Sequence, residues 1–506
     1  DYVIQSFSRD KPFNQFLVEQ LAGDELFDYE NPKNKINEKI YESLVATGFL
    51  RTTPDRTFQD ITNFVPDRLD VIADEIQVLG SAILGMTVNC SRCHAHKFDP
   101  IPQQDYYRLS AIFKGAYDEH DWLKPENRNL EIPTSRLASD VPSYVLESAK
   151  EGKISIRALW SRGRPSPAYL LLRGNPLTPG EKIEPNLPEF ALASIKRPVF
   201  QIEKIQHQTQ KSGRRLAFAN WITSESHPLT SRVFVNRVWH SLFGKGIVET
   251  LDNFGKTGAK PSHPELLDYL AVQFIDDAWS VKQLIRRMVT SRTYQQSSQV
   301  EQKTLKIDPD NSLYSRMPLK RLSAETVRDA ILKITRQLSS HKFGPPRPVE
   351  EQGNGLILSK RLSTGGWTRS IYVLHRRSKI PTILESFDYP QMGPNCIVRK
   401  TSIVPQQALH LTNNAQVHTW CQSLAKSLQE ELSNDFGRMI SELCLTTFGK
   451  PPTLDEVNEY QDYFNQLNQQ WSQELSLSPT DPKVQRKSIA TICHTLINTA
   501  QFLYTD

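Results

Sequence analysis

Apolar residues recur at helical spacing in several stretches of the chain. The clearest stretch follows Leu69, where Ile72, Ile76, Leu79 and Ile83 come three or four positions apart. This is the spacing of one face of an α-helix. The pattern predicts a helix that runs from about Leu69 to about Ile83.

Three further stretches have the spacing of a capping box, in which a Ser or Thr is followed three residues later by Glu or Gln. They are Ser262 with Glu265, Ser280 with Gln283, and Thr453 with Glu456. An apolar periodic stretch follows each pair, as expected where a helix begins. We therefore predict three helices that start just after these polar residues.

Strand signals are sparse, and Tyr169–Leu172 and Ile371–Leu374 are the two short candidates. Between about Asp121 and Thr209 the helical periodicity fades, and Pro, Gly, Ser and charged residues take over. We predict a mainly α protein with two helical domains joined by an irregular connector with a little β structure. The predicted parts are residues 1–120, 121–209 and 210–506.

The composition is that of a globular protein, with 38% hydrophobic and 23% charged residues among 506. The net charge of +5, from 61 basic and 56 acidic residues, is too small over this length to favour nucleic-acid binding. No apolar stretch reaches the roughly 18–20 residues that span a bilayer. The chain opens at Asp1 within a running element, without an initiator Met or a signal peptide, so we expect a fragment or a processed chain.

The strongest chemical signal is a Cys-x-x-Cys-His motif formed by Cys90, Cys93 and His94. This pattern is typical of covalent c-type haem attachment. Two thiols three residues apart can reach both vinyl groups of one porphyrin, and the adjacent imidazole can bind the iron as an axial ligand. Because this attachment takes place outside the cytoplasm, the motif predicts an exported protein, periplasmic or extracellular.

Two other interpretations of the motif stay open. Zinc needs four ligands, and Cys90, Cys93 and either His94 or His96 supply three, with His120 as a candidate fourth. A redox-active dithiol or a disulfide is the third interpretation, although no βαβ pattern surrounds the pair.

If haem is bound, the second axial ligand of the iron is a separate question. His96, Met86 and His120 are the candidates in the sequence, and a five-coordinate iron is the alternative. Two strong ligands favour electron transfer, whereas an open position permits ligand or peroxide chemistry.

The residues around the motif resemble a known family. The segments Arg9–Phe13, Gln20–Asp24, Gly85–Ile101 and Asp105–Tyr107 look like the planctomycete cytochrome-associated domain numbered fifteen forty-nine among domains of unknown function. Downstream segments resemble its usual partner, domain fifteen fifty-three: Asn236–Trp239, Phe243–Gly246, Ser262–Leu267, Arg321–Asp329 and Val404–Leu409. The resemblance covers nearly the whole chain and implies an exported bacterial protein grouped with cytochromes, without a settled reaction. In this family the first domain usually begins before the position of Asp1, and a cytochrome-like domain often precedes it.

The C-terminal part is rich in arginines interleaved with carboxylates. They are Arg316, Arg321, Glu325, Arg328, Asp329, Arg369, Arg376, Arg377, Asp388 and Arg399. One interpretation is an anion or sulfated-sugar site that includes Arg369, Arg376 and Arg377, since guanidinium groups match sulfate and carboxylate geometry. The other is a set of ion pairs that brace helices, such as Glu325 with Arg328 or Asp329 with Arg321.

No Gly-x-Ser-x-Gly elbow and no phosphate-binding glycine loop occurs in the sequence, so no catalytic residue is assigned. The leading hypothesis is an exported haem c protein for electron transfer or redox chemistry, with an unknown redox partner. The second hypothesis is a zinc-stabilised protein that binds or organises extracellular polysaccharide. The third is a hydrolase that acts on sulfated polysaccharide.

Overall fold

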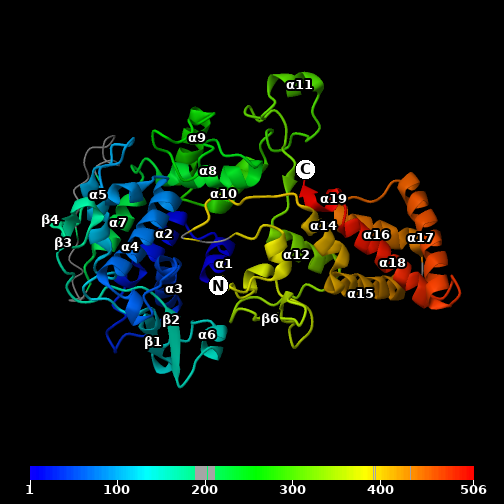
Figure 1. Cartoon of the computed structure of the whole chain (residues 1–506), viewed down its shortest axis with the longest axis horizontal. Coiled ribbons are helices and arrows are strands. Elements are labelled where there is room, and N and C mark those ends of the chain that lie inside the picture. Colours follow the sequence, from blue (N-terminus) through cyan, green and yellow to red (C-terminus); the bar gives the residue numbers. More distant parts are fainter. Residues whose placement is uncertain (189–201, 203–210, 391–392, 394, 433–434, 506) are drawn as a thin grey trace. The chain divides into compact units, whose positions relative to one another are not determined.

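Helices dominate the structure, a computed structural model that describes residues 1–188, 202, 211–390, 393, 395–432 and 435–505 (Figure 1). The predicted mainly α class is confirmed. Strands occur among these residues as four two-stranded antiparallel pairs. The chain divides into two compact units, Asp1–Pro318 with Met392–Val398, and Leu319–Gln391 with Arg399–Asp506.

The first unit contains eleven α-helices among the described residues. They are α1 Tyr2–Ser8, α2 Phe13–Ala22, α3 Glu38–Ala46, α4 Val65–Leu79, α5 Gln103–Phe113, α6 Ser143–Glu147, α7 Arg214–Ile222, α8 Thr230–Phe243, α9 Pro264–Asp276, α10 Val281–Val289 and α11 Gln302–Ile307. Its strands form two hairpins. Strand β1 (Asn129–Pro133) pairs with β2 (Lys153–Arg157), and β3 (Ala168–Leu171) pairs with β4 (Pro179–Ile183).

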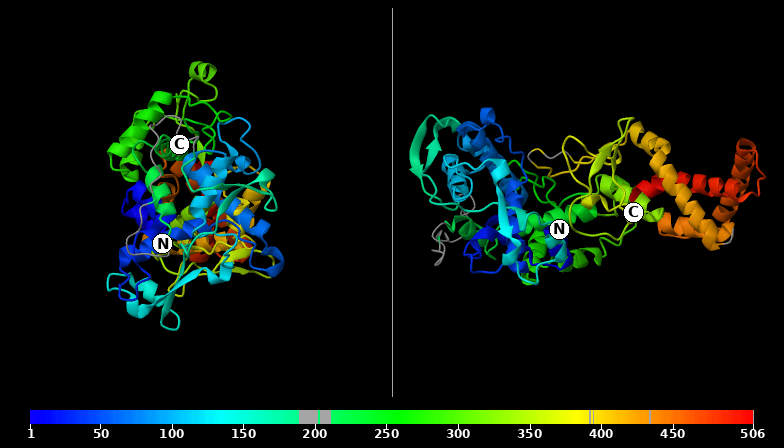
Figure 2. Two further views of the ribbon diagram at one scale, coloured as in Figure 1. Left: turned by 90° about the vertical axis from the view of Figure 1, so that its left-hand side faces the viewer. Right: turned by 90° about the horizontal axis from the view of Figure 1, so that it is seen from below.

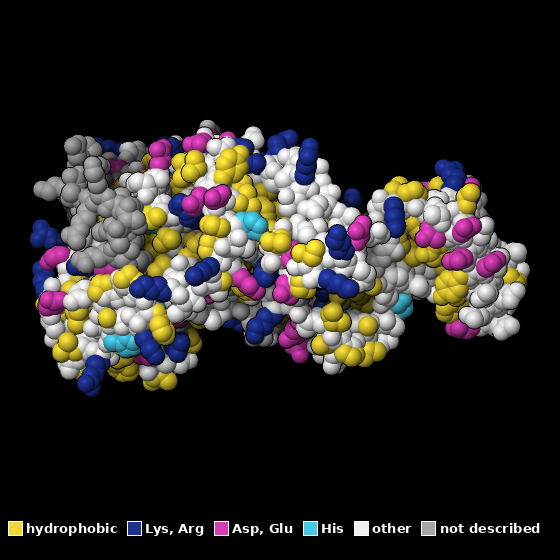
Figure 3. Space-filling view, turned by 90° about the horizontal axis from the view of Figure 1, so that it is seen from above, with side chains coloured by type: hydrophobic (Ala, Val, Ile, Leu, Met, Phe, Trp, Pro, Cys, Tyr) yellow, Lys and Arg dark blue, Asp and Glu magenta, His cyan; other side chains and the backbone are white. Residues whose placement is uncertain are grey.

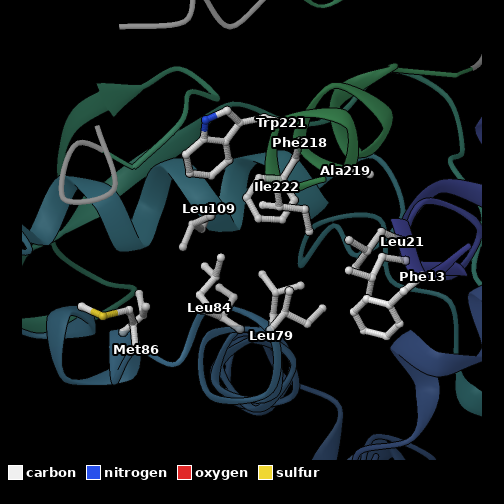
Figure 4. Close-up of a cluster of buried hydrophobic side chains, with 14 of the residues drawn as sticks. Phe13, Leu21, Leu79, Leu84, Met86, Leu109, Phe218, Ala219, Trp221 and Ile222 are labelled. Carbon is white, nitrogen blue, oxygen red and sulfur yellow. The ribbon is translucent and has the colours of Figure 1, made fainter. Parts of the chain in front are cut away.

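One hydrophobic core joins α2, α4, α5 and α7 in this unit. Leu21, Leu79, Leu109 and Phe218, one from each helix, are almost completely buried and point toward a shared interior (Figure 4). Removal of such side chains from water is the main stabilising contribution in a core of this kind. The expected boundary near residue 210 therefore does not coincide with the division of the structure, because helices from α7 onward complete the core of the N-terminal segment.

The predicted helix at Leu69–Ile83 is present as α4, which begins slightly earlier, at Val65. A π-helical turn, Gly80–Leu84, continues α4 directly, and Gly85 ends it in the left-handed conformation with φ 61°. The apolar spacing thus predicted the extent of the element. The Cys-x-x-Cys-His motif follows shortly after this wider, π-helical turn.

The first part of the expected connector packs against the N-terminal segment. Ile132 of β1 and Ile154 of β2 are 2% exposed and share a small core with Ile36 and with Leu44 of α3. The predicted strand at Tyr169–Leu172 is confirmed as β3, displaced by one residue. The remainder of the expected connector, 189–201 and 203–210, lies outside the described residues.

The second unit contains eight α-helices in its described part. They are α12 Ala324–Ile334, α13 Thr382–Ser386, α14 Pro405–Asn413, α15 Ala415–Leu432, α16 Phe436–Phe448, α17 Leu454–Leu475, α18 Pro482–Ile497 and α19 Ala500–Leu503. Strand β5 (Lys320–Arg321) pairs with β8 (Tyr504–Thr505), and β6 (Val349–Glu351) pairs with β7 (Ile357–Ser359). Helix α18 packs against α15 and α17, as the right-hand view of Figure 2 shows.

The predicted strand at Ile371–Leu374 is wrong. Ser370–Tyr372 form a 3-10 turn instead. The reason is a long-range contact, since Asp329 of α12 accepts hydrogen bonds from the backbone N–H and the hydroxyl of Ser370, at 2.8 and 2.7 Å. These bonds hold the chain in a turn, and Val373 pairs with Arg347 only through an isolated bridge.

Two of the three predicted caps are confirmed. Ser280 accepts from the N–H of Gln283 at 3.1 Å, and the box between Thr453 and Glu456 is complete. The cap predicted at Ser262 is wrong, because α9 begins at Pro264 with His263 as its N-cap. Proline is favoured at the first helical position, where no N–H is needed.

Replacing Thr453 with alanine is expected to lower the free energy of unfolding of the second unit by about 1 kcal/mol, because the N–H of Glu456 loses its acceptor. Urea unfolding, followed by hydrogen exchange in peptides from α17, measures the change. Thr453→Ser keeps the hydroxyl and is the matched control. Equal losses in the two variants would show that the cap contributes nothing.

None of the helices within the described ranges is both long and apolar enough to cross a membrane. On the face shown in Figure 3, basic and acidic side chains are interspersed with apolar ones.

Candidate functional site

Cys90 lies in a short 3-10 helix, Val88–Arg92, and Cys93 follows this helix directly as its C-cap; both thiols belong to exposed residues. In a 3-10 helix, side chains three positions apart share one face. Val88 and Ser91 are 1% and 0% exposed and anchor the inner face. Cys90 and Cys93 are likewise three positions apart, both are exposed, and neither forms a disulfide.

His94 is exposed, and its ring is oriented by its own neighbour. Its Nδ1 lies 2.7 Å from the carbonyl oxygen of Ala95. The hydrogen on Nδ1 can therefore donate to that oxygen, which leaves Nε2 as the unprotonated nitrogen in the neutral ring. Metal-binding histidines are commonly held in this way.

His96 has a structural position. Its ring is 5% exposed. The Nδ1 atom accepts from the backbone N–H groups of Asp99 and Phe98 at 2.9 and 3.3 Å, and Nε2 lies 3.2 Å from the hydroxyl of Thr87. Both ring nitrogens are thus engaged in closing the loop after the motif, and binding a metal would break these bonds.

Asp99 ties this loop to the segment after α8. Its Oδ1 accepts from the N–H of Lys256 at 2.6 Å. Gly255 is required for this approach, because a Cβ there would lie 2.5 Å from the carboxylate oxygens. Asp99 was not among the predicted site residues, although the His-x-x-Asp spacing after the motif could have indicated this positioning role.

The other two candidates for a second axial ligand differ in accessibility. Met86 is 7% exposed and its sulfur lies in the core of the first unit (Figure 4). The His120 side chain is 58% exposed, with Nε2 3.7 Å from Glu119 Oε1. His120 is therefore the accessible one of the three candidates.

In the described part of the chain, no three or more His, Cys, Asp or Glu side chains are grouped so that they could hold a metal ion. Cys90, Cys93, His94 and His96 lie close together in sequence, but His96 is turned inward while the first three are exposed. The tetrahedral arrangement that zinc prefers is thus not assembled at the motif.

The arginines of the second unit brace the fold with partners other than those predicted. Arg328, 2% exposed, donates to the hydroxyls of Ser359 and Ser370 at 2.8 and 3.1 Å and pairs with the adjacent Asp329. The proposed pairing of Glu325 with Arg328 is wrong, because Glu325 pairs with Arg399 at 2.6 Å.

The proposed pairing of Arg321 with Asp329 is wrong as well, because Arg321 pairs with Asp388, at 3.7 Å. Both partners follow from tertiary contacts that sequence spacing does not contain. Arg369, Arg376 and Arg377, predicted to bind an anion, are exposed residues before and after the Ser370–Tyr372 turn. An anion site there stays a prediction.

Comparison with protein families places two matches on the chain. PSCyt2, described as a protein of unknown function (DUF1549), matches residues 1–118, and PSD1, described as a protein of unknown function (DUF1553), matches residues 214–464. No curated protein and no solved structure matches. The first match contains the whole Cys-x-x-Cys-His motif, and the second begins at α7. The chain therefore belongs to the planctomycete cytochrome-associated family that pairs these two domains.

Proposed function

We propose that Cys90 and Cys93 attach one c-type haem through thioether bonds, that His94 binds its iron, and that the protein serves electron transfer or redox chemistry. The observation that carries this proposal is that both thiols, three positions apart at the end of the short 3-10 helix, are exposed and form no disulfide. The neighbouring His94 has Nδ1 held by a carbonyl, and its Nε2 is the nitrogen left for a metal. The family name PSCyt2 is consistent with an association with cytochromes.

The arrangement of the ligands favours haem over zinc. Zinc requires its ligands to converge on one point at about 2.0–2.3 Å, and no such group exists among the residues described. Haem is attached at the edge of the porphyrin, while the iron lies at the centre. The two thiols and the imidazole therefore need a common accessible surface and no common point.

Met86, which is buried in the core, and His96, whose ring nitrogens are both engaged, would not bind the iron. The exposed His120 is the further residue that could bind it. A bound haem would supply one-electron chemistry. Because thioether attachment takes place outside the cytoplasm, the proposal includes a periplasmic or extracellular location.

The test is a denatured mass spectrum of the protein made in a strain that matures c-type cytochromes. The native chain is expected to gain the mass of one haem, and Cys90→Ala/Cys93→Ala is expected to gain none. Cys396→Ala removes a half-buried thiol elsewhere and is the matched control, which should keep the haem. His94→Ala should retain covalent haem with an altered absorption spectrum.

An unmodified native chain that carries stoichiometric zinc under native conditions would overturn the haem proposal. It would favour the second hypothesis, a zinc-stabilised protein that binds or organises extracellular polysaccharide.

A further inference from the structure

A largely enclosed cavity of about 190 Å³ borders the Cys-x-x-Cys-His motif in the first unit. Arg92, which lies between the two cysteines, forms part of its wall. The cavity is bounded by α4, α5 and the β3–β4 hairpin. The turn of that hairpin also contacts the motif, because a Cβ on Gly174 would lie 2.8 Å from Cys93 Sγ.

The size of the cavity suits a single ring. An engineered apolar cavity of about 150 Å³ holds one benzene molecule, whereas pockets for larger organic ligands span about 300–1,000 Å³. Much of the cavity lining is apolar, with Val65 and Leu69 from α4, and Leu171, Pro176 and Pro179 from the hairpin. Apolar side chains of this kind suit an aromatic ring.

Two hydroxyls in the wall, those of Tyr106 and Ser110, make no hydrogen bond among the described residues, although the residues are only 3% and 8% exposed. They lie four positions apart on α5 and therefore on one face of that helix. Glu119 directs Oε1 to Lys114 at 2.9 Å, and its Oε2 is fully buried, so this carboxylate is not open to the cavity. The two hydroxyls are suited to a ligand that both donates and accepts.

The cations of the cavity are already neutralised, which argues against an anionic ligand. Arg92 pairs with Asp70 at 2.7 Å. Lys114 donates to the Ser166 hydroxyl and to the Pro167 carbonyl oxygen, besides its pair with Glu119. Burial raises the pKa of Tyr106, so its hydroxyl stays protonated as a donor.

We propose that this cavity binds one neutral single-ring phenol, with the ring against the apolar residues and the hydroxyl group beside those of Tyr106 and Ser110. A phenol hydroxyl both donates and accepts, which supplies a partner to the two hydroxyls that the fold leaves without one. A sugar ring carries hydroxyls around its whole rim, and the apolar walls would leave most of them without partners. The proposal goes beyond haem attachment and does not depend on it.

Binding of phenol to the full chain, measured by ligand-observed NMR, tests the proposal. Saturable binding at one site is expected, with toluene bound at least about fivefold more weakly because it has no hydroxyl. Tyr106→Phe and Ser110→Ala, which each remove one hydroxyl, should each weaken phenol binding about fivefold and leave toluene binding unchanged. Tyr41→Phe, which alters a tyrosine outside the cavity wall, is the matched control.

Absence of phenol binding would overturn the proposal, as would binding that neither variant weakens. Toluene bound as tightly as phenol would show that the polar wall does not select the ligand. A methyl pyranoside bound more tightly than phenol would overturn the ligand class. The two variants are independent, so one that fails to fold leaves the other to decide.

Discussion

Replacing Arg215 with methionine is expected to lower the free energy of unfolding of the first unit by about 3–5 kcal/mol. Arg215 of α7 is 0% exposed, and its guanidinium lies 2.7 Å from Asp24 Oδ2 and 3.7 Å from Glu25 Oε1. It also donates to the carbonyl oxygen of Leu21 and the hydroxyl of Ser161, at 2.8 and 3.0 Å.

The large effect follows from what the substitution leaves behind. Asp24 and Glu25 are 0% and 1% exposed, so their charges would remain in the interior without the cation that compensates them. An uncompensated buried charge is far more costly than the loss of a surface pair. The same pair connects α7 to the segment after α2, so its loss should weaken the packing of these two elements together.

The matched control is Arg232→Met in α8. Arg232 pairs with Asp268 at 2.7 Å, but the two side chains are 33% and 58% exposed. A pair of this kind contributes about 0–1 kcal/mol. Urea unfolding, with hydrogen exchange in peptides from α2 and α7, resolves the first unit from the second. Equal effects of the two substitutions would contradict the expected role of Arg215.

Local patterns in the sequence predicted the elements that depend on local contacts. The apolar spacing after Leu69 predicted α4, and Ser280 and Thr453 predicted helix starts, because each signal and its effect lie within one or two turns. The prediction at Ile371–Leu374 failed because Asp329, some forty residues earlier in the chain, fixes that segment as a turn. The ion-pair partners predicted for Arg321 and Glu325 were wrong for the same reason, because the observed partners depend on long-range contacts.

The candidate site shows the same difference between features set by local contacts and features set by long-range contacts. The spacing of Cys90, Cys93 and His94 identified the motif, because the i, i+3 relation of the thiols is local. The engagement of His96 and the burial of Met86 depend on the folded loop and on a core formed by distant helices. The cavity beside the motif could not be predicted, since its walls come from α4, α5 and a hairpin some sixty residues downstream.

The division into units illustrates the same limit on a larger scale. Between residues 121 and 209 the helical periodicity fades, and Pro, Gly, Ser and charged residues become more frequent. This is a real difference in composition. It does not specify which helices share a core. Phe218 of α7 shares one buried core with Leu21 and Leu109, which are far from it in the sequence. The sequence pattern alone does not show that α7 is the helix that completes this core.

Raising the pH from about 5 to 8 is expected to destabilise the first unit through Glu75 of α4. This side chain is 5% exposed, and its Oε1 accepts a hydrogen bond from the Thr53 hydroxyl at 2.6 Å. Burial raises the pKa of Glu75 to about 8. In the unfolded chain a glutamate has a pKa of about 4.3. Between these values the folded state holds a proton that the unfolded state has released.

The stability contributed by the protonated carboxyl is therefore fully present below about pH 4.3 and is lost as the pH rises toward 8. The free energy of unfolding should fall by up to about 1.4 kcal/mol for each pH unit in this range from Glu75 alone. Glu75→Gln stays neutral at every pH and keeps a similar shape. Its stability should thus fall less steeply, and the difference from the native chain should be largest at pH 8.

Urea unfolding at pH 5, 6.5 and 8, with hydrogen exchange in peptides from α4, measures both slopes. Glu131→Gln is the control, since Glu131 is an exposed residue of β1 whose replacement should leave the slope unchanged. Parallel profiles for the native chain and Glu75→Gln would mean that Glu75 ionises without cost in the folded protein. In that case water or a shift of α4 must reach the carboxylate, and the packing of α4 on the loop around Thr53 would be looser than its burial indicates.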